Sequence, residues 1–283
     1  MNAPKLPKPN SAGTQYGTQY GSTPGHHLGA TAPTSWFPPL AWTLGYIALM
    51  ALSLVTAQLV FNTNFNDPNF LFNFLPLMTI LALYAAIALK MVGFKTPVVA
   101  DLNAPTQAGS AALIWVAPWI ALEVLFLGYV AAQATADSAL AAPMVIAFAF
   151  TALVGFAEEA IFRGVLLSGT ARALGVIPAM LLSAVLFSLL HAVNFLGGMA
   201  TGAIFTQLWR TLLFGLAFAP IVILCRRLWP VILVHWWWDF LVVVMPSVPG
   251  GDSYLHLLQQ ADLALQIVMG TVAWIVVVSR FQR

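Results

Sequence analysis

The chain has 283 residues, of which 60% are hydrophobic and only 7% are Asp, Glu, Lys or Arg. Soluble globular proteins contain about 25% charged residues, so this composition excludes an ordinary soluble domain. The formal net charge of +2 gives no basis for binding nucleic acid. We therefore expect an integral membrane protein whose surroundings are the lipid bilayer.

The N-terminal segment differs in composition from the rest of the chain. It is rich in Gly, Ser, Thr, Pro and Gln, contains the repeat GTQYGTQYGS, and cannot bury enough apolar surface to fold. We expect residues 1–38 to form a disordered cytoplasmic tail and residues 39–283 to form a helical transmembrane domain. The first apolar run exceeds the length of a signal-peptide core, so no cleavable signal is predicted.

Apolar runs long enough to span a bilayer follow one another along the remaining chain. The predicted spans are residues 40–62, 70–92, 111–134, 141–170, 176–197, 202–225, 228–246 and 261–280. Because the connections are too short for a folded extramembrane unit, the prediction is an all-α fold. It is a single polytopic membrane helical bundle of about eight transmembrane helices.

Basic residues gather at one end of the predicted spans. Ten of the eleven Lys and Arg residues fall on that side: Lys5, Lys8, Lys90, Lys95, Arg163, Arg172, Arg226, Arg227, Arg280 and Arg283. The positive-inside rule then places both termini in the cytoplasm. We expect a multi-pass protein of the plasma (inner) membrane.

Eight ionisable residues lie well inside the predicted spans, away from the span ends. They are Glu123, Glu158, Glu159, Arg163, His191, Arg210, His235 and Asp239. A charged residue at the centre of a membrane helix costs about 2.5 to 3.5 kcal/mol, so such residues must be paired, neutral or in contact with water. We expect Glu123 and Arg210 to form structural pairs and the others to form a functional site.

Helical spacing indicates which of these side chains meet. Glu159 and Arg163 are four residues apart, so they lie on one helix face in the orientation that favours an ion pair. Glu158 points about 100° away from that face. His235 and Asp239 share the same four-residue spacing and project together from the seventh predicted span.

The depth of these residues predicts a shared cavity. Counted from residue 173, in the turn between the fourth and fifth spans, Glu158 lies 15 residues back and His191 lies 18 residues forward. At about 1.5 Å per residue the two side chains reach similar depths. We expect one cavity to hold Glu158, His191, His235 and Asp239, and to open toward the cytoplasm.

The chemistry of this set favours hydrolysis by an activated water. The chain has no GxSxG motif, no HExxH motif, and no Ser or Cys paired with a base. A carboxylate in a poorly solvated cavity is a suitable general base, and a neighbouring histidine can orient the water.

Three motifs carry a resemblance to a known family. EEAIFR matches an EExxxR motif, FSLLH (residues 187–191) matches FxxxH, and HWWWD (residues 235–239) matches an HxxxN-type motif. In this order and on separate helices, they resemble the CPBP family of intramembrane proteases. It is also called the CAAX protease and bacteriocin-processing, or Abi, family, and includes the Ras-converting CAAX endopeptidases. The resemblance covers about residues 140–245.

The resemblance implies an eight-helix fold that cleaves peptide bonds at the membrane. It implies that Glu158 and His191 activate water, that His235 and Asp239 stabilise the oxyanion, and that Glu159 is a further catalytic candidate beside its structural pairing with Arg163. Where the CAAX endopeptidases have Asn, this chain has Asp239. Asp239 must then be protonated to donate a hydrogen bond, or hold His235 in its donating form.

No cofactor-binding residue and no required cofactor is predicted. The family has been described both as metalloproteases and as glutamic proteases, so a divalent metal such as zinc stays possible. The histidines and carboxyls suit zinc's preference for N and O ligands, but their loosely defined arrangement favours metal-free catalysis. The single cysteine, Cys225, argues against a thiolate site.

Two other classes of function stay open. The same charges could couple a secondary transporter to protons, although the chain shows no inverted repeat. The fold could also belong to a catalytically silent peptide-binding or immunity protein. For a protease, the substrate would be a CAAX-type prenylated protein, a bacteriocin precursor or a membrane-anchored sorting signal. The oligomeric state is left open.

Overall fold

Every regular element in the described part of the chain is a helix. The computed structural model describes residues 35–92 and 110–281, and eight helices in these ranges are long and apolar enough to cross a membrane. The predicted all-α, multi-pass membrane bundle is confirmed. Residues 1–34 of the predicted tail lie outside the described residues, and the first helix begins at Phe37.

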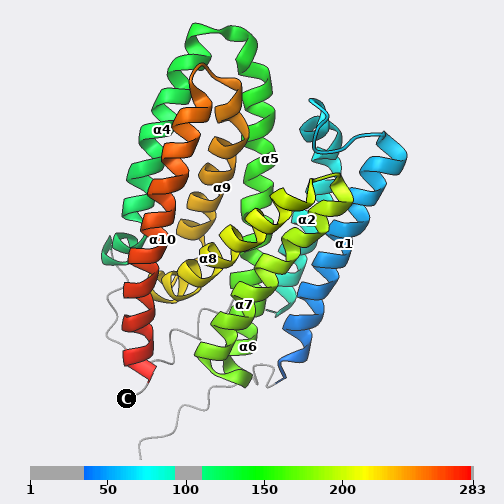
Figure 1. Cartoon of the computed structure of the whole chain (residues 1–283). Helices are drawn as coiled ribbons and strands as arrows, with labels where there is room; N and C mark the ends of the chain where they lie inside the picture. The colour runs from blue at the N-terminus through cyan, green and yellow to red at the C-terminus, as the bar shows by residue number, and fades with distance from the viewer. Residues whose placement is uncertain (1–34, 93–109, 282–283) are drawn as a thin grey trace, which may run out of the picture. The chain divides into compact units, whose positions relative to one another are not determined.

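The elements are drawn in Figure 1. The long helices are α1 (Phe37–Phe61), α2 (Phe70–Val92), α4 (Ala117–Ala136), α5 (Ala141–Glu159), α7 (Val176–Leu190), α8 (Thr201–Cys225), α9 (Trp229–Val244) and α10 (Gly251–Phe281). Between them lie the 3-10 turns η1 (Ser110–Trp115), η2 (Ser138–Leu140), η4 (His191–Gly197) and η5 (Met245–Ser247), the π-helix η3 (Ala160–Leu167) and the short helix α6 (Ser168–Leu174).

Two predicted spans begin at other residues in the structure. The third was expected from residue 111, but a 3-10 turn occupies Ser110–Trp115 and the α-helix begins at Ala117, with a proline in its first turn. The last was expected from residue 261, but α10 begins at Gly251. Hydropathy detects only the apolar part of a helix, whereas the polar start of α10 is helical with Asp252 favourably placed near the helix N-terminus.

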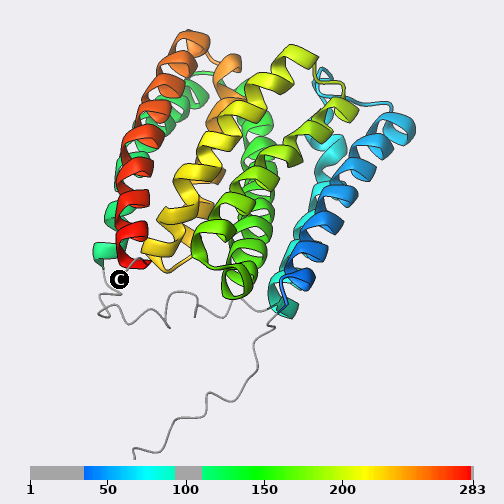
Figure 2. The same cartoon turned by 60° about the horizontal axis from the view of Figure 1, so that its bottom comes forward.

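Helix α5 and the π-helix η3 that follows it join the helices that carry the motifs, since α5 packs against α9 and η3 packs against α7. Helix α5 packs against α2 and α9, α7 packs against α8, and α8 packs in turn against α10. Helix α4 covers α9 and α10, and α1 lies beside α2. Figures 1 and 2 show α7 and α8 crossing beside α5 and α9.

Gly155 and Gly215 each allow a close approach of two helices. A Cβ atom on Gly155 of α5 would lie 2.9 Å from the backbone nitrogen of Trp236 in α9, and one on Gly215 of α8 would lie 2.8 Å from the Cα of Ala184 in α7. Small residues at these contacts let membrane helices pack backbone to backbone. The Gly155 contact places His235 opposite the two glutamates at the end of α5.

Candidate active site

Glu158 and Glu159 are the last two residues of α5, and the backbone changes to a π-helix directly after them. All eight residues of η3 are buried. Short π-helical segments inside α-helices are rare and occur frequently at functional sites. No residue pattern in this segment predicted the change.

Glu159 links two motifs through one oxygen. Its Oε1 accepts a hydrogen bond from Arg163 Nη1 at 2.9 Å and another from His235 Nδ1 at 2.9 Å. Both Glu159 and Arg163 have side chains with no exposed surface. The predicted ion pair is therefore present, and the bond to His235 is an addition that helical spacing did not predict.

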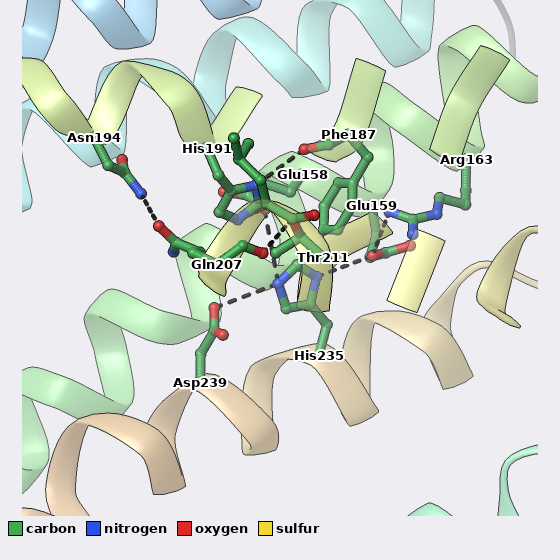
Figure 3. Close-up of polar contacts among 11 residues, drawn as sticks. Glu158, Glu159, Arg163, Phe187, His191, Asn194, Gln207, Thr211, His235 and Asp239 are labelled. Carbon is green, nitrogen blue, oxygen red and sulfur yellow. Dashed lines mark hydrogen bonds and ion pairs between the residues drawn. The ribbon is translucent and has the colours of Figure 1, made fainter. Parts of the chain in front are cut away.

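His235 presents its other ring nitrogen to the remaining carboxyls of the set. Because Nδ1–H donates to Glu159, Nε2 is the nitrogen that faces the site. It lies 3.4 Å from Asp239 Oδ2 and 3.8 Å from Glu158 Oε2. Figure 3 shows His235 between the two glutamates on one side and Asp239 on the other.

His191 approaches Glu158 from the end of α7. Its Nδ1–H donates to the carbonyl oxygen of Phe187 at 2.9 Å, so Nε2 is the nitrogen left facing Glu158 Oε2, at 3.9 Å. That carboxylate oxygen is buried and has no hydrogen-bond partner among the described residues. The structure therefore brings together Glu158, His191, His235 and Asp239 as the sequence predicted (Figure 3).

Two cavities meet at this cluster. The first, of about 710 Å³, is lined by Glu158, His191 and Asp239 and otherwise mostly by apolar side chains of α1, α2 and α5. The second, of about 530 Å³, is lined by His191, His235 and Asp239 together with polar residues of α8 and α10. A substrate in either cavity would contact the cluster.

The predicted opening of the cavity toward the basic helix ends is wrong. The first cavity is lined as far as Asp67 and Ser247, which lie in the connections at the opposite helix ends. On the basic side, η3 fills the space with side chains such as Phe162 and Leu166, neither of which has exposed surface. Close packing on that side leaves the opposite end as the route to the site.

Phe187 is a site residue whose role the sequence reasoning missed. Its ring centroid lies 4.2 Å from Arg163 Cζ and 5.1 Å from the His191 ring, and Phe214 of α8 lies 5.2 Å from the His235 ring. Phe187 is the first residue of the FxxxH motif, so the motif alone could have identified it as a site residue. Phe214 lies outside the three motifs.

Within residues 35–92 and 110–281, the structural pairs expected for the two remaining intramembrane charges, Glu123 and Arg210, are not formed. Neither carboxylate oxygen of buried Glu123 has a hydrogen-bond partner in the described ranges. Arg210 likewise has no ion pair within 4.0 Å among the described residues. Ser188 donates its hydroxyl hydrogen to the carbonyl oxygen of Leu208 at 2.7 Å. This is a structural hydrogen bond, and it agrees with the prediction that the chain does not use a serine nucleophile.

The carboxyls and histidines of the site do not form a metal-ligand set as they stand. Within residues 35–92 and 110–281, no group of three or more His, Cys, Asp or Glu side chains is arranged to hold a metal ion. Glu158 Oε2 is 3.8 to 3.9 Å from both imidazole nitrogens. Ligand atoms that share a tetrahedral zinc at about 2.0 to 2.2 Å lie closer together than this.

The comparisons with known proteins agree with the three motifs. Residues 139–241 match the model of the family described as type II CAAX prenyl endopeptidase Rce1-like. No curated protein and no solved structure matches the chain. The match confirms the resemblance and supports a CAAX-type intramembrane endopeptidase in general. The segment that carries the motifs, residues 139–241, thus matches the family of Rce1-like type II CAAX prenyl endopeptidases.

Proposed function

We propose that the protein is an intramembrane endopeptidase in which Glu158 and His191 activate the attacking water. The observation that carries the proposal is the position of Glu158 Oε2, which faces Nε2 of His191 at 3.9 Å and Nε2 of His235 at 3.8 Å. These separations are too long for direct hydrogen bonds. Two groups that bind the same water lie roughly 4 to 5 Å apart, so a slight separation of these side chains would admit one water between them.

The proposed hydrolysis consists of proton transfers between the attacking water, Glu158 and the leaving nitrogen of the substrate. Glu158 takes a proton from the water while the water oxygen forms a bond to the peptide carbonyl carbon, and the carbonyl electrons move to its oxygen. Collapse of this tetrahedral intermediate breaks the C–N bond, and Glu158 returns the proton to the leaving nitrogen. His191 accepts the second water hydrogen at Nε2 and so orients the attack.

His235 is the candidate donor to the oxyanion. Its Nδ1–H is fixed on Glu159, so a second proton on Nε2 would point toward Glu158 and Asp239, where the carbonyl oxygen would lie. Glu159 acts through His235 and is a positioning residue. Asp239 holds His235 in the donating form, as a carboxylate orients a catalytic histidine in other hydrolases.

A membrane-associated peptide or protein suits the cavities as substrate. Apolar side chains such as Phe74, Met144 and Phe150 line the first cavity, so they can hold an apolar anchor. The family description favours a CAAX-type prenylated protein over a bacteriocin precursor or a sorting signal. We also propose that the protein resides in the plasma (inner) membrane with both termini in the cytoplasm, as the basic residues indicate.

The proposal is tested with the purified full chain in phospholipid nanodiscs and a farnesylated peptide that ends in a CAAX sequence. Mass spectrometry should detect a new carboxyl terminus inside the peptide with the native protein and none with Glu158→Gln. Glu123→Gln makes the same change at another buried carboxyl outside the motifs and controls for insertion and folding. Equal product from native protein and Glu158→Gln would contradict the mechanism.

A further inference from the structure

Arg210 is an intramembrane cation that the proposed reaction does not use. It lies near the middle of α8 and lines the second cavity together with His191, His235 and Asp239. In the part of the chain that the structure describes, its guanidinium makes no ion pair within 4.0 Å and no hydrogen bond. A cation at this depth requires a partner or water.

Asp262, an acid that lines the same cavity, already has hydrogen-bond partners. Asp262 of α10 accepts a hydrogen bond from Trp119 Nε1 at 2.9 Å on one oxygen and from Gln266 Nε2 at 2.6 Å on the other. These bonds fix the Asp262 carboxylate, whose charge still interacts with that of Arg210. Asp262 therefore offsets the charge of Arg210 at a distance and leaves the guanidinium donors available.

The ligand class follows from the shape of the guanidinium. Its planar fork of N–H donors matches the two oxygens of a carboxylate and can bind them in parallel. The cavity around it is polar enough to admit a peptide end, since Thr206 and Gln207 of α8 face Gln259 and Gln266 of α10. An apolar anchor would lie on the other side of the cluster, in the first cavity.

The position of Arg210 also suits a carboxylate near the cleaved bond. Phe214 follows Arg210 by about one helical turn, a rise of about 6 Å, and the Phe214 ring lies 5.2 Å from the His235 ring. A carboxylate on Arg210 would thus lie on the order of 10 Å from the site, which an extended peptide covers in about three residues.

We propose that Arg210 binds a carboxylate of the substrate in the second cavity and so sets which bond reaches Glu158. The inference rests on the proposed endopeptidase function. The carboxylate is either the C-terminal one or that of an acidic side chain close to the end, because both present the same two oxygens. Arg210 is then a specificity-determining residue on a helix that lies between the second and third motifs.

The test measures binding apart from cleavage. Full-length Glu158→Gln protein in nanodiscs is titrated with a fluorescent farnesylated CAAX peptide, as the free acid and as the C-terminal amide, and Kd is read by fluorescence anisotropy. The acid should bind at least about tenfold more tightly than the amide, the loss expected when one charged hydrogen-bond partner is removed. Adding Arg210→Gln should weaken binding of the acid to the level of the amide, and Arg210→Lys should retain part of the difference.

Matched controls separate this site from a general charge effect. Arg227→Gln makes the same change at an exposed arginine just beyond the far end of α8 and should leave the acid preference intact. An amide peptide with Asp as its last residue distinguishes the two sources: tight binding assigns the site to any carboxylate, and weak binding assigns it to the C-terminus.

Equal affinity for acid and amide when Arg210 is present, or no binding of either peptide, would overturn the inference. The comparison of acid and amide uses protein that retains Arg210, so it does not depend on whether an Arg210 variant folds. Cleavage of the acid peptide by the native protein is scored separately. Acid-selective binding without cleavage would reject the proposed function alone, and cleavage without acid selectivity would reject only the role of Arg210.

Discussion

His235 Nδ1 lies 2.9 Å from Glu159 Oε1, the oxygen that also accepts a hydrogen bond from Arg163 Nη1 at 2.9 Å. One buried carboxylate thus joins a structural cation to a histidine of the site. Glu159 belongs both to the ion pair that stabilises the fold and to the support of the reaction. Its removal should therefore affect stability and turnover in different ways.

Glu159→Gln should lower stability first. The change leaves Arg163 as a buried unpaired charge, which costs about 3 to 5 kcal/mol when one partner of a buried pair is lost. A thermal melt of the protein in detergent should show a lower Tm, and protein level in membranes should fall. An unchanged Tm would mean that the ion pair contributes nothing to the fold.

The double variant Glu159→Gln with Arg163→Met separates the two roles of Glu159. Removing both charges should recover much of the lost stability. Turnover per folded molecule should stay below that of the native protein, because a neutral amide holds the His235 imidazolium less strongly than a carboxylate does. Full recovery of turnover would leave Glu159 with a structural role only.

Gly155→Ala should separate α9 from α5. The new Cβ would lie 2.9 Å from the backbone nitrogen of Trp236, one residue from His235, and overpacking of this kind costs about 1 to 3 kcal/mol. Both Tm and turnover should fall. Gly128→Ala is the matched control, since a Cβ at that helical glycine meets nothing within 4 Å, and it should be neutral or slightly stabilising.

Much of this site could be predicted because its local geometry is fixed by spacing. The Glu159–Arg163 pair follows from a four-residue step on one helix, and the meeting of Glu158 with His191 follows from equal depth in two antiparallel spans. Apolar runs likewise predicted the eight helices of the described residues that are long and apolar enough to cross a membrane, since a bilayer sets their length.

The remaining features depend on contacts between segments far apart in the chain. The bond from His235 to Glu159 needs the close approach at Gly155, and the direction of the first cavity depends on how η3 fills the opposite side. The π-helix that begins after Glu159 is a further example. Helical periodicity describes one helix at a time and contains no information on such packing.

Asp239→Asn should preserve activity within about tenfold. The amide no longer holds His235 in its donating form, but it keeps the size of the side chain and can itself donate a hydrogen bond to the oxyanion in place of His235, which an ionised carboxylate cannot. Asp239→Ala removes both possibilities and should lower kcat by about 100-fold or more. Equal loss in the two variants would show that the negative charge of Asp239 is itself required.

Hydrolysis should survive removal of divalent metals. Among the described residues no three His, Cys, Asp or Glu side chains are arranged to hold a metal ion, so turnover of the CAAX peptide should be unchanged after dialysis against a chelator. The control is a zinc peptidase treated in the same way. Loss of activity that one divalent ion restores would contradict metal-free catalysis.

The most direct test of the account is a comparison of turnover and binding in Glu158→Gln. The substitution keeps the size and hydrogen bonding of the side chain but removes the base, so kcat for the CAAX peptide should fall by at least about 100-fold while Kd and Tm stay close to the native values. A folded Glu158→Gln protein that cleaves at the native rate would show that Glu158 is not the base and would contradict the central claim.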